Sequence, residues 1–152
     1  MSKRISVLSV AVVWCLTGGS ASAGWFTTDE QEAREAFARG RYQEAVAKFD
    51  DPYRKGVAQY RSEDYRSAVE SFSRVDRDDV RLAARYNLGN ARFRIGDYEG
   101  AVEAYESVLQ EDPNDRLARH NLALALSMLA QSEANPEEEA PPQEEEQPQE
   151  KP

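Results

Sequence analysis

The sequence predicts an all-α protein, built as a right-handed array of about three helical hairpins followed by one C-terminal helix. The first observation is an internal repeat, because residues 53–75 recur 33 residues later as 86–108 with ten identities in 23 positions. The second is that glycine and alanine recur at fixed places beside tyrosine and phenylalanine. Repeats of this length indicate stacked helical units, each of which buries its apolar face only against its neighbours.

The N-terminal residues 1–23 have the pattern of a secretory signal peptide. Lys3 and Arg4 precede an apolar run over 5–16, and a small-residue motif at 21–23 predicts cleavage between Ala23 and Gly24. An uncleaved anchor is the alternative, but about twelve apolar residues are too few for a hydrocarbon layer of about 30 Å. We therefore expect an exported, periplasmic protein of the bacterial cell envelope. Its single cysteine, Cys15, would be removed with the signal, so neither a disulfide nor a thiol site is expected.

The C-terminal residues 132–152 predict a disordered tail, rich in proline, glutamate and glutamine. They contain no aromatic or branched aliphatic residue, so they cannot bury enough apolar area to offset the entropy of ordering. The net charge of the chain is −9, and its middle part is mildly acidic with mixed signs. Nucleic acid is therefore not an expected partner, because phosphate backbones require a basic surface.

The domain between these ends, 24–130, divides into units. A degenerate repeat is expected at about 28–50 and a second repeat at about 51–81. Tyr42, Ala45 and Phe49 match residues only 23 positions further on, so ten residues are missing around Pro52 and the helices on either side should be short. A third repeat follows at 82–115, and a capping helix is expected at 116–131, since helical arrays need a solvated end.

Within the third repeat, small residues are expected to let two helices approach. Gly89 and Ala101 supply the small positions, while Leu88, Tyr98 and Tyr105 fill the space around them. Gly96 suits a left-handed turn between the two helices, and Asp97 suits the cap of the second one.

The third repeat resembles the tetratricopeptide repeat (TPR), with Leu88-Gly89, Ala101, Tyr105 and Pro113 at its characteristic positions. The order of segments over 25–130 is similar to the TPR part of the bacterial Bat (aerotolerance-type) proteins, in a free-standing form. This resemblance implies a scaffold in an envelope complex with von Willebrand factor A-domain membrane proteins and a MoxR-type ATPase. The segments that carry it are Trp25, Thr28–Gln31, Phe37–Gly40, Tyr42, Phe49–Pro52, Lys55–Arg61, Asp64-Tyr65 and Tyr86–Ala91.

The first helices of such an array line a concave groove, where arginine and amide side chains offer hydrogen bonds to carboxylates of a partner peptide. The alternative is that these side chains are ordinary surface, or that Asn87 and Asn90 satisfy hydrogen bonds between helices. If the groove binds acidic segments, the tail of the chain is itself a candidate occupant. The candidate groove residues are Tyr53, Arg54, Val57, Tyr60, Arg61, Tyr86, Asn87, Asn90, Arg94, His120 and Asn121.

The capping helix carries two apolar stripes. Leu122, Leu126 and Leu129 are expected to close the array, which leaves Leu117, Leu124 and Met128 as a possible docking stripe for a partner or a second copy. The alternative is that the array holds the helix by one broad face.

No pattern in the sequence predicts catalysis. His120 is the only histidine and has no neighbouring ligand cluster, and the pairs Asp50-Asp51 and Asp78-Asp79 are expected in turns, where aspartate caps helices. We therefore predict no metal, cofactor, small-molecule substrate or enzymatic activity. The expected function is protein–protein interaction, as an envelope scaffold or, alternatively, as a periplasmic chaperone that holds client segments.

Overall fold

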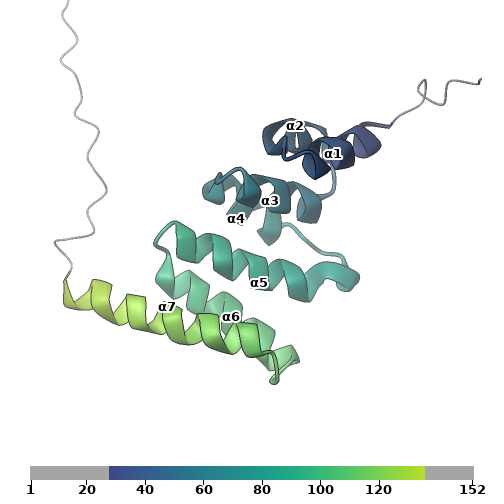
Figure 1. Ribbon diagram of the computed structural model, residues 1–152. Coiled ribbons are helices and arrows are strands. Elements are labelled where there is room, and N and C mark those ends of the chain that lie inside the picture. The colour runs from purple at the N-terminus through teal and green to yellow at the C-terminus, as the bar shows by residue number, and fades with distance from the viewer. Residues whose placement is uncertain (1–27, 136–152) are drawn as a thin grey trace, which may run out of the picture.

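A computed structural model describes residues 28–135, and these form seven helices and no strand (Figure 1). The predicted all-α array of three helix pairs and a final helix is therefore confirmed. The predicted signal peptide and residues 136–152 of the predicted tail lie outside the described residues. No helix within 28–135 is both long and apolar enough to cross a membrane. The helices are α1 (Asp29–Ala38), α2 (Tyr42–Lys48), α3 (Pro52–Arg61), α4 (Tyr65–Ser73), α5 (Asp78–Arg94), α6 (Tyr98–Glu111) and α7 (Arg116–Ala134).

Most helices begin at a residue whose side chain accepts a hydrogen bond from the first turn. Thr28 and Gln31 form a capping box at α1. Aspartate carboxylates accept backbone N–H bonds at the start of the other capped helices, namely Asp51 for α3, Asp64 for α4, Asp97 for α6 and Asp115 for α7.

The three turns within the helix pairs share one geometry. In each, a backbone N–H reaches back across the last turn with a bond of 2.9 Å, and the residue before it has a positive φ. Glycine occupies that position in two turns, at Gly40 with φ 75° and at Gly96 with φ 80°, as the sequence predicts for Gly96. The middle turn has Glu63 there instead, with φ 65°.

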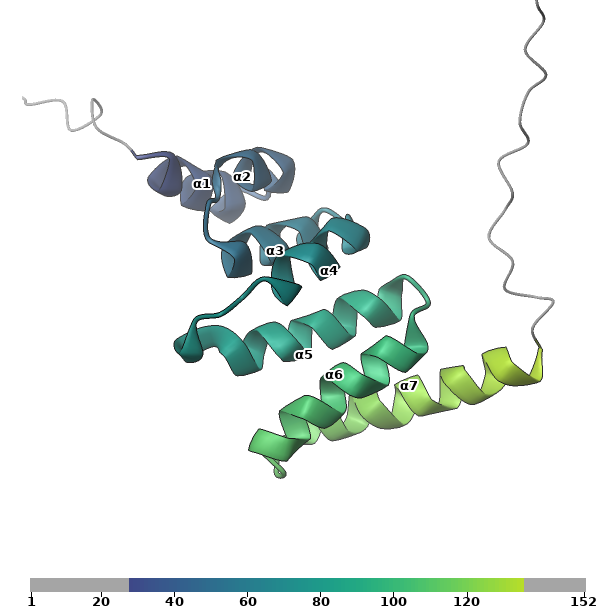
Figure 2. The same cartoon turned by 180° about the vertical axis from the view of Figure 1, so that it is seen from behind.

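The helices stack in chain order, and each packs against the next (Figure 1). The odd-numbered helices α1, α3, α5 and α7 lie along one side of the stack, and α3, α5 and α7 run in the same direction in both views (Figure 2). α5 also contacts α3 and α7 directly. The residues that face outward from these helices therefore form a continuous surface.

Small residues dominate the core. Eleven of the fifteen buried hydrophobic residues are alanines, so the helices approach closely and few large side chains fill the space between them. A Cβ atom on Gly56 would lie 2.8 Å from the ring of Phe72, and one on Gly89 would lie 2.6 Å from the ring of Tyr105. The glycines of the repeated segment are thus required because an aromatic ring lies directly against the helix backbone.

The structure corrects two boundaries. α5 begins at Asp78 rather than at about 82, so Asp78 and Asp79 lie in its first turn and not in a connecting turn. Both carboxylates pair with arginines there. α7 continues to Ala134, so residues 132–134 are helical and not part of the tail. The expected short helices are present, since α2 has seven residues and α3 has ten.

The predicted inward stripe on α7 is wrong for Leu126, which is 47% exposed. Ala118 and Ala125 are the fully buried residues of α7, and Leu122 packs beside Ala125. Because successive helical residues are about 100° apart, Leu126 lies on the flank of this contact face. Small residues determine the seam because they allow α7 to approach α6.

Candidate functional site

A hollow of about 350 Å³ lies between α3 and α5 on the side of the odd-numbered helices. Six of its seven lining residues are candidates from the sequence, which the fold thus brings together. The seventh, Phe72, comes from α4 and its ring lies against Gly56. The sequence does not predict that Phe72, which is only 3% exposed, borders this hollow. The lining residues are Tyr53, Val57, Tyr60, Arg61, Phe72, Asn87 and Asn90.

A second hollow, of about 450 Å³, continues the first toward α1. Tyr53 and Val57 line both hollows, and the second adds the rings of Phe37 and Phe49. Sequence analysis missed these two phenylalanines as groove residues, although their positions at the ends of α1 and α2 are the signal that would have found them. The second hollow is lined by Arg34, Phe37, Phe49, Tyr53, Arg54 and Val57. We call the two hollows together the groove.

The groove is lined by three arginines and by no aspartate or glutamate. Two of these arginines share one carboxylate, since Arg34 lies 3.1 Å from a carboxylate oxygen of Glu30 and Arg54 pairs with the same carboxylate. The guanidinium of Arg61, by contrast, has no ion pair or hydrogen bond to any residue of 28–135. Among the described residues, Arg61 is therefore the groove arginine that has no carboxylate partner.

A hydrogen-bond network joins α5, α6 and α7 beside the groove. The hydroxyl of Tyr105 donates to Oδ1 of Asn90 at 2.8 Å, and Nδ2 of Asn121 donates to the same oxygen and to the hydroxyl of Tyr86, both at 3.0 Å. Tyr105 is 1% exposed, and this burial raises the pKa of its hydroxyl. The oxygen of Asn90 therefore makes hydrogen bonds between helices, as the alternative interpretation expects, and Asn121 does so as well.

The amide nitrogen of Asn90 and the side chain of Asn87 make no hydrogen bond within residues 28–135. Both asparagines line the same hollow as Arg61. That hollow therefore combines a guanidinium and two amide groups with the rings of Tyr53 and Tyr60. Its polar groups favour a ligand that accepts hydrogen bonds, because the oxygen of Asn90 is already occupied.

Arg94 extends the basic surface by one repeat. Its guanidinium carbon lies 4.3 Å from the centroid of the Tyr65 ring, and that ring contacts Tyr60 edge-on at 5.1 Å. Arg61 and Arg94 are the last residues of α3 and α5, and these two helices end at the same edge of the stack. Cations there also complement the negative ends of the two helix dipoles.

The remaining candidates are not brought into the groove hollows. His120 is exposed on α7 and has no side-chain partner within the described residues. In the predicted docking stripe, Leu117 is 64% and Leu124 is 45% exposed, while Met128 is half-buried. Leu117 and Leu124 do not form one stripe with the exposed Leu126, since Leu124 and Leu126 lie roughly 160° apart around the helix.

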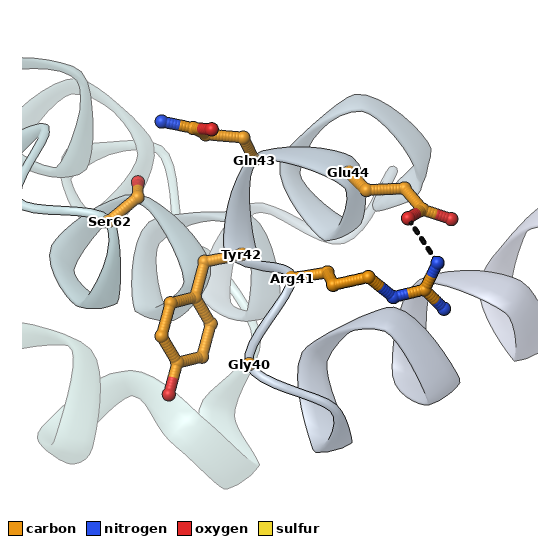
Figure 3. Close-up of a pocket in the computed structure, with 6 residues that line it drawn as sticks. All are labelled: Gly40, Arg41, Tyr42, Gln43, Glu44 and Ser62. Carbon is orange, nitrogen blue, oxygen red and sulfur yellow. Dashed lines mark ion pairs between the residues drawn. The ribbon is translucent and has the colours of Figure 1, made fainter.

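A third hollow, of about 440 Å³, lies at the turn between α1 and α2, next to Ser62 (Figure 3). Arg41 and Glu44 point toward each other there and form an ion pair of 2.8 Å, whereas Tyr42 points away from both (Figure 3). Because its charges are paired and exposed, this hollow offers little to a ligand. Within the described part of the chain, no group of three His, Cys, Asp or Glu residues is placed to hold a metal ion.

Comparison with known proteins identifies the repeat. Residues 53–116 match the family model described as tetratricopeptide repeat. The first TPR domain of the human RPAP3 protein has a similar structure, with a TM-score of 0.61 and 23% identity over 71% of this chain and 94% of that domain. The second TPR domain of the same human protein, solved with the HSP70 peptide SGPTIEEVD, gives a TM-score of 0.57 and 20% identity over 65% and 92% of the two chains.

No curated protein sequence matches this chain. Residues 53–116 match the tetratricopeptide-repeat model, and the seven stacked helices of the described residues define the class of fold as a helical-repeat array. Tetratricopeptide-repeat domains are protein–protein interaction modules, and stacked helical repeats form concave binding surfaces.

Proposed function

We propose that the groove binds an extended segment of a partner protein that carries carboxylates together with an apolar side chain. The observation that carries this proposal is the unpaired guanidinium of Arg61 in one hollow with Asn87 and Asn90. Guanidinium and amide groups form charge-assisted hydrogen bonds to carboxylates. No acidic side chain lines either hollow, so a carboxylate entering the groove meets no direct repulsion there.

The aromatic part of the groove accounts for the apolar side chain of the ligand. Phe37, Phe49, Tyr53 and Val57 line a hollow that is continuous with the Arg61 side. Burial of one aliphatic side chain among them contributes about 1.5–3 kcal/mol to binding. The peptide bound by the similar human domain, SGPTIEEVD, combines acidic residues with isoleucine and valine, which is the composition that this groove favours.

Fluorescence anisotropy with labelled SGPTIEEVD as the probe tests the proposal. We expect Arg61→Ala to weaken binding by roughly tenfold or more, since a hydrogen bond to a charged group contributes about 1.5–3 kcal/mol. Arg66→Ala is the matched control, because Arg66 is exposed on α4 and has no partner within 28–135. It removes the same charge away from the groove, so it should change the affinity less than twofold at moderate salt. Equal losses in the two variants would show only a general charge effect and would refute a specific site.

The cellular role that we propose is that of a scaffold in the bacterial envelope, in a Bat/MoxR-type stress or aerotolerance complex with von Willebrand factor A-domain proteins. The predicted signal peptide and the resemblance of 25–130 support it. Cell fractionation tests the periplasmic location. Cross-linking followed by purification tests the role: a scaffold returns a few stoichiometric partners that Arg61→Ala removes, whereas a chaperone returns many substoichiometric ones.

A further inference from the structure

We propose that the acidic segment 136–152 of this chain occupies the Arg61 side of the groove and competes with partner peptides. The inference rests on the proposed function, because it assigns a regulator to the same site. The segment 136–152 is strongly acidic. Against one basic residue, Lys151, the segment carries seven glutamates, which are Glu137, Glu138, Glu139, Glu144, Glu145, Glu146 and Glu150.

The segment follows α7, and the C-terminal ends of α3, α5 and α7 lie along the same edge of the stack (Figures 1 and 2). α7 ends at Ala134, and Arg61 and Arg94 are the last residues of α3 and α5. α5 contacts α3 on one side and α7 on the other, so two helix-to-helix steps of 8–10 Å, about 20 Å in all, separate α7 from α3. Seventeen residues span up to about 55 Å. The segment is therefore long enough to reach both arginines.

Within the described residues, Arg61 and Arg94 lack the ion pairs that most arginines of the array form. Most arginines of the array form ion pairs within 28–135, as Arg77 does with Asp51 at 2.6 Å. Neither Arg61 nor Arg94 pairs with an acidic residue of that range. Two cations without carboxylate partners thus lie at the edge of the stack where α7 ends, and the acidic segment follows α7 in the sequence. Attachment to the same chain gives that segment an effective concentration in the millimolar range.

The segment matches only one half of the groove. It contains alanine and proline but no larger apolar residue, so it has no side chain to fill the hollow of Phe37, Phe49 and Tyr53. A partner peptide with an isoleucine or valine uses both halves and therefore displaces the segment. The groove then selects against ligands that offer charge alone.

Substitution of all seven glutamates by glutamine in the full chain tests the inference while keeping the chain length. With labelled SGPTIEEVD as the probe, we expect the substituted chain to bind roughly three- to tenfold more tightly than the unmodified chain at low salt. The difference should disappear at about 0.5 M salt. It should also disappear when Arg61→Ala is present in both chains.

Equal affinities of the unmodified and substituted chains, with measurable binding in both, would overturn the inference and leave the proposed function intact. Absence of binding in both chains would overturn the proposed function itself. NMR gives a readout that does not depend on the probe. The side-chain N–H signals of Arg61, Asn87 and Asn90 should differ between the two chains at low salt. Identical signals in the two chains would contradict the inference. A difference that vanishes on dilution would contradict it as well, because the segment would then come from a second copy.

Discussion

The hydroxyl of the buried Tyr105 donates a hydrogen bond of 2.8 Å to Oδ1 of Asn90, and the same oxygen accepts a second bond from Asn121. One groove residue therefore has two tasks. Its oxygen holds α5, α6 and α7 together, and its nitrogen remains available to a ligand.

The first prediction concerns this shared oxygen. Asn90→Ala leaves the buried hydroxyl of Tyr105 without its acceptor and should lower the free energy of unfolding by about 1–3 kcal/mol. Tyr105→Phe keeps the bond from Asn121 to Asn90, so it should cost only about 0.5–1.5 kcal/mol. Urea denaturation followed by circular dichroism measures both. Gln110→Ala, at an exposed position of α6, is the control for helix content. If Asn90→Ala lowers the free energy of unfolding no more than Tyr105→Phe does, Oδ1 of Asn90 is not the shared acceptor.

The second prediction concerns alkaline pH. Burial raises the pKa of Tyr105 in the folded state above the value of about 10 that tyrosine has in an unfolded chain. The unfolded state therefore loses this proton first. The stabilising contribution is complete below pH 10 and declines as the pH rises from there toward the pKa of the folded state.

Unfolding free energies between pH 9 and 11.5 measure this decline. Tyr105→Phe should make the decline of the unfolding free energy with pH shallower. Tyr42→Phe, at a half-buried position of α2, should show the same decline as the unmodified chain. An unchanged slope in Tyr105→Phe would exclude Tyr105 as the source.

The third prediction concerns Gly89, at the closest approach of α5 and α6. A methyl group there would lie 2.6 Å from Cε1 of Tyr105, so Gly89→Ala should destabilise the protein by about 1–3 kcal/mol despite the better helix propensity of alanine. Asn87→Ala introduces the same residue on the same helix and should stay within about 0.5 kcal/mol of the unmodified chain. Urea denaturation compares them, and a Gly89→Ala variant as stable as the control would show that the ring moves aside without cost.

The fourth prediction concerns Glu63, which has a φ of 65° where the two equivalent turns have glycine. A left-handed conformation costs an L-residue about 1–2 kcal/mol, and glycine loses about 0.5–1 kcal/mol more backbone entropy on folding. Glu63→Gly should therefore stabilise the protein by about 0.5–1 kcal/mol in thermal or urea unfolding. Gly96→Ala should do the reverse. Destabilisation by Glu63→Gly would mean that the glutamate side chain makes a compensating interaction.

The internal repeat predicted most of the fold because its periodicity records which residues face a neighbouring helix. The helix number follows from it directly, whereas the left-handed turn at Gly96 follows from the residue type there, since the repeat has Glu63 at the equivalent position. The inward placement of Leu126 was wrong, since residue size alone does not show that a seam of alanines, at Ala118 and Ala125, holds α7 more closely than leucines would.

The candidate site was predictable in part for a similar reason. The first helices supply the groove, so residues such as Arg61 and Asn87 were identified by their positions in the repeat. The hydrogen bonds of Asn90 and the place of the buried Phe72 ring beside the hollow depend on contacts between helices that one sequence does not record. A lone sequence gives residue types along a helix face, but not which of them are already bound to a neighbour.

The unequal helix lengths imply that the array does not open uniformly. α1 to α4 have seven to ten residues each, whereas α5 to α7 have 14 to 19. In a linear stack the local unfolding free energy follows the contacts of each unit with its neighbours, so amide hydrogens of the first four helices should exchange faster than those of the last three. One wall of the groove, α3, thus belongs to the more readily opened half. A ligand that bridges α3 and α5 therefore protects the N-terminal helices from exchange, and part of its binding free energy is used to hold them closed.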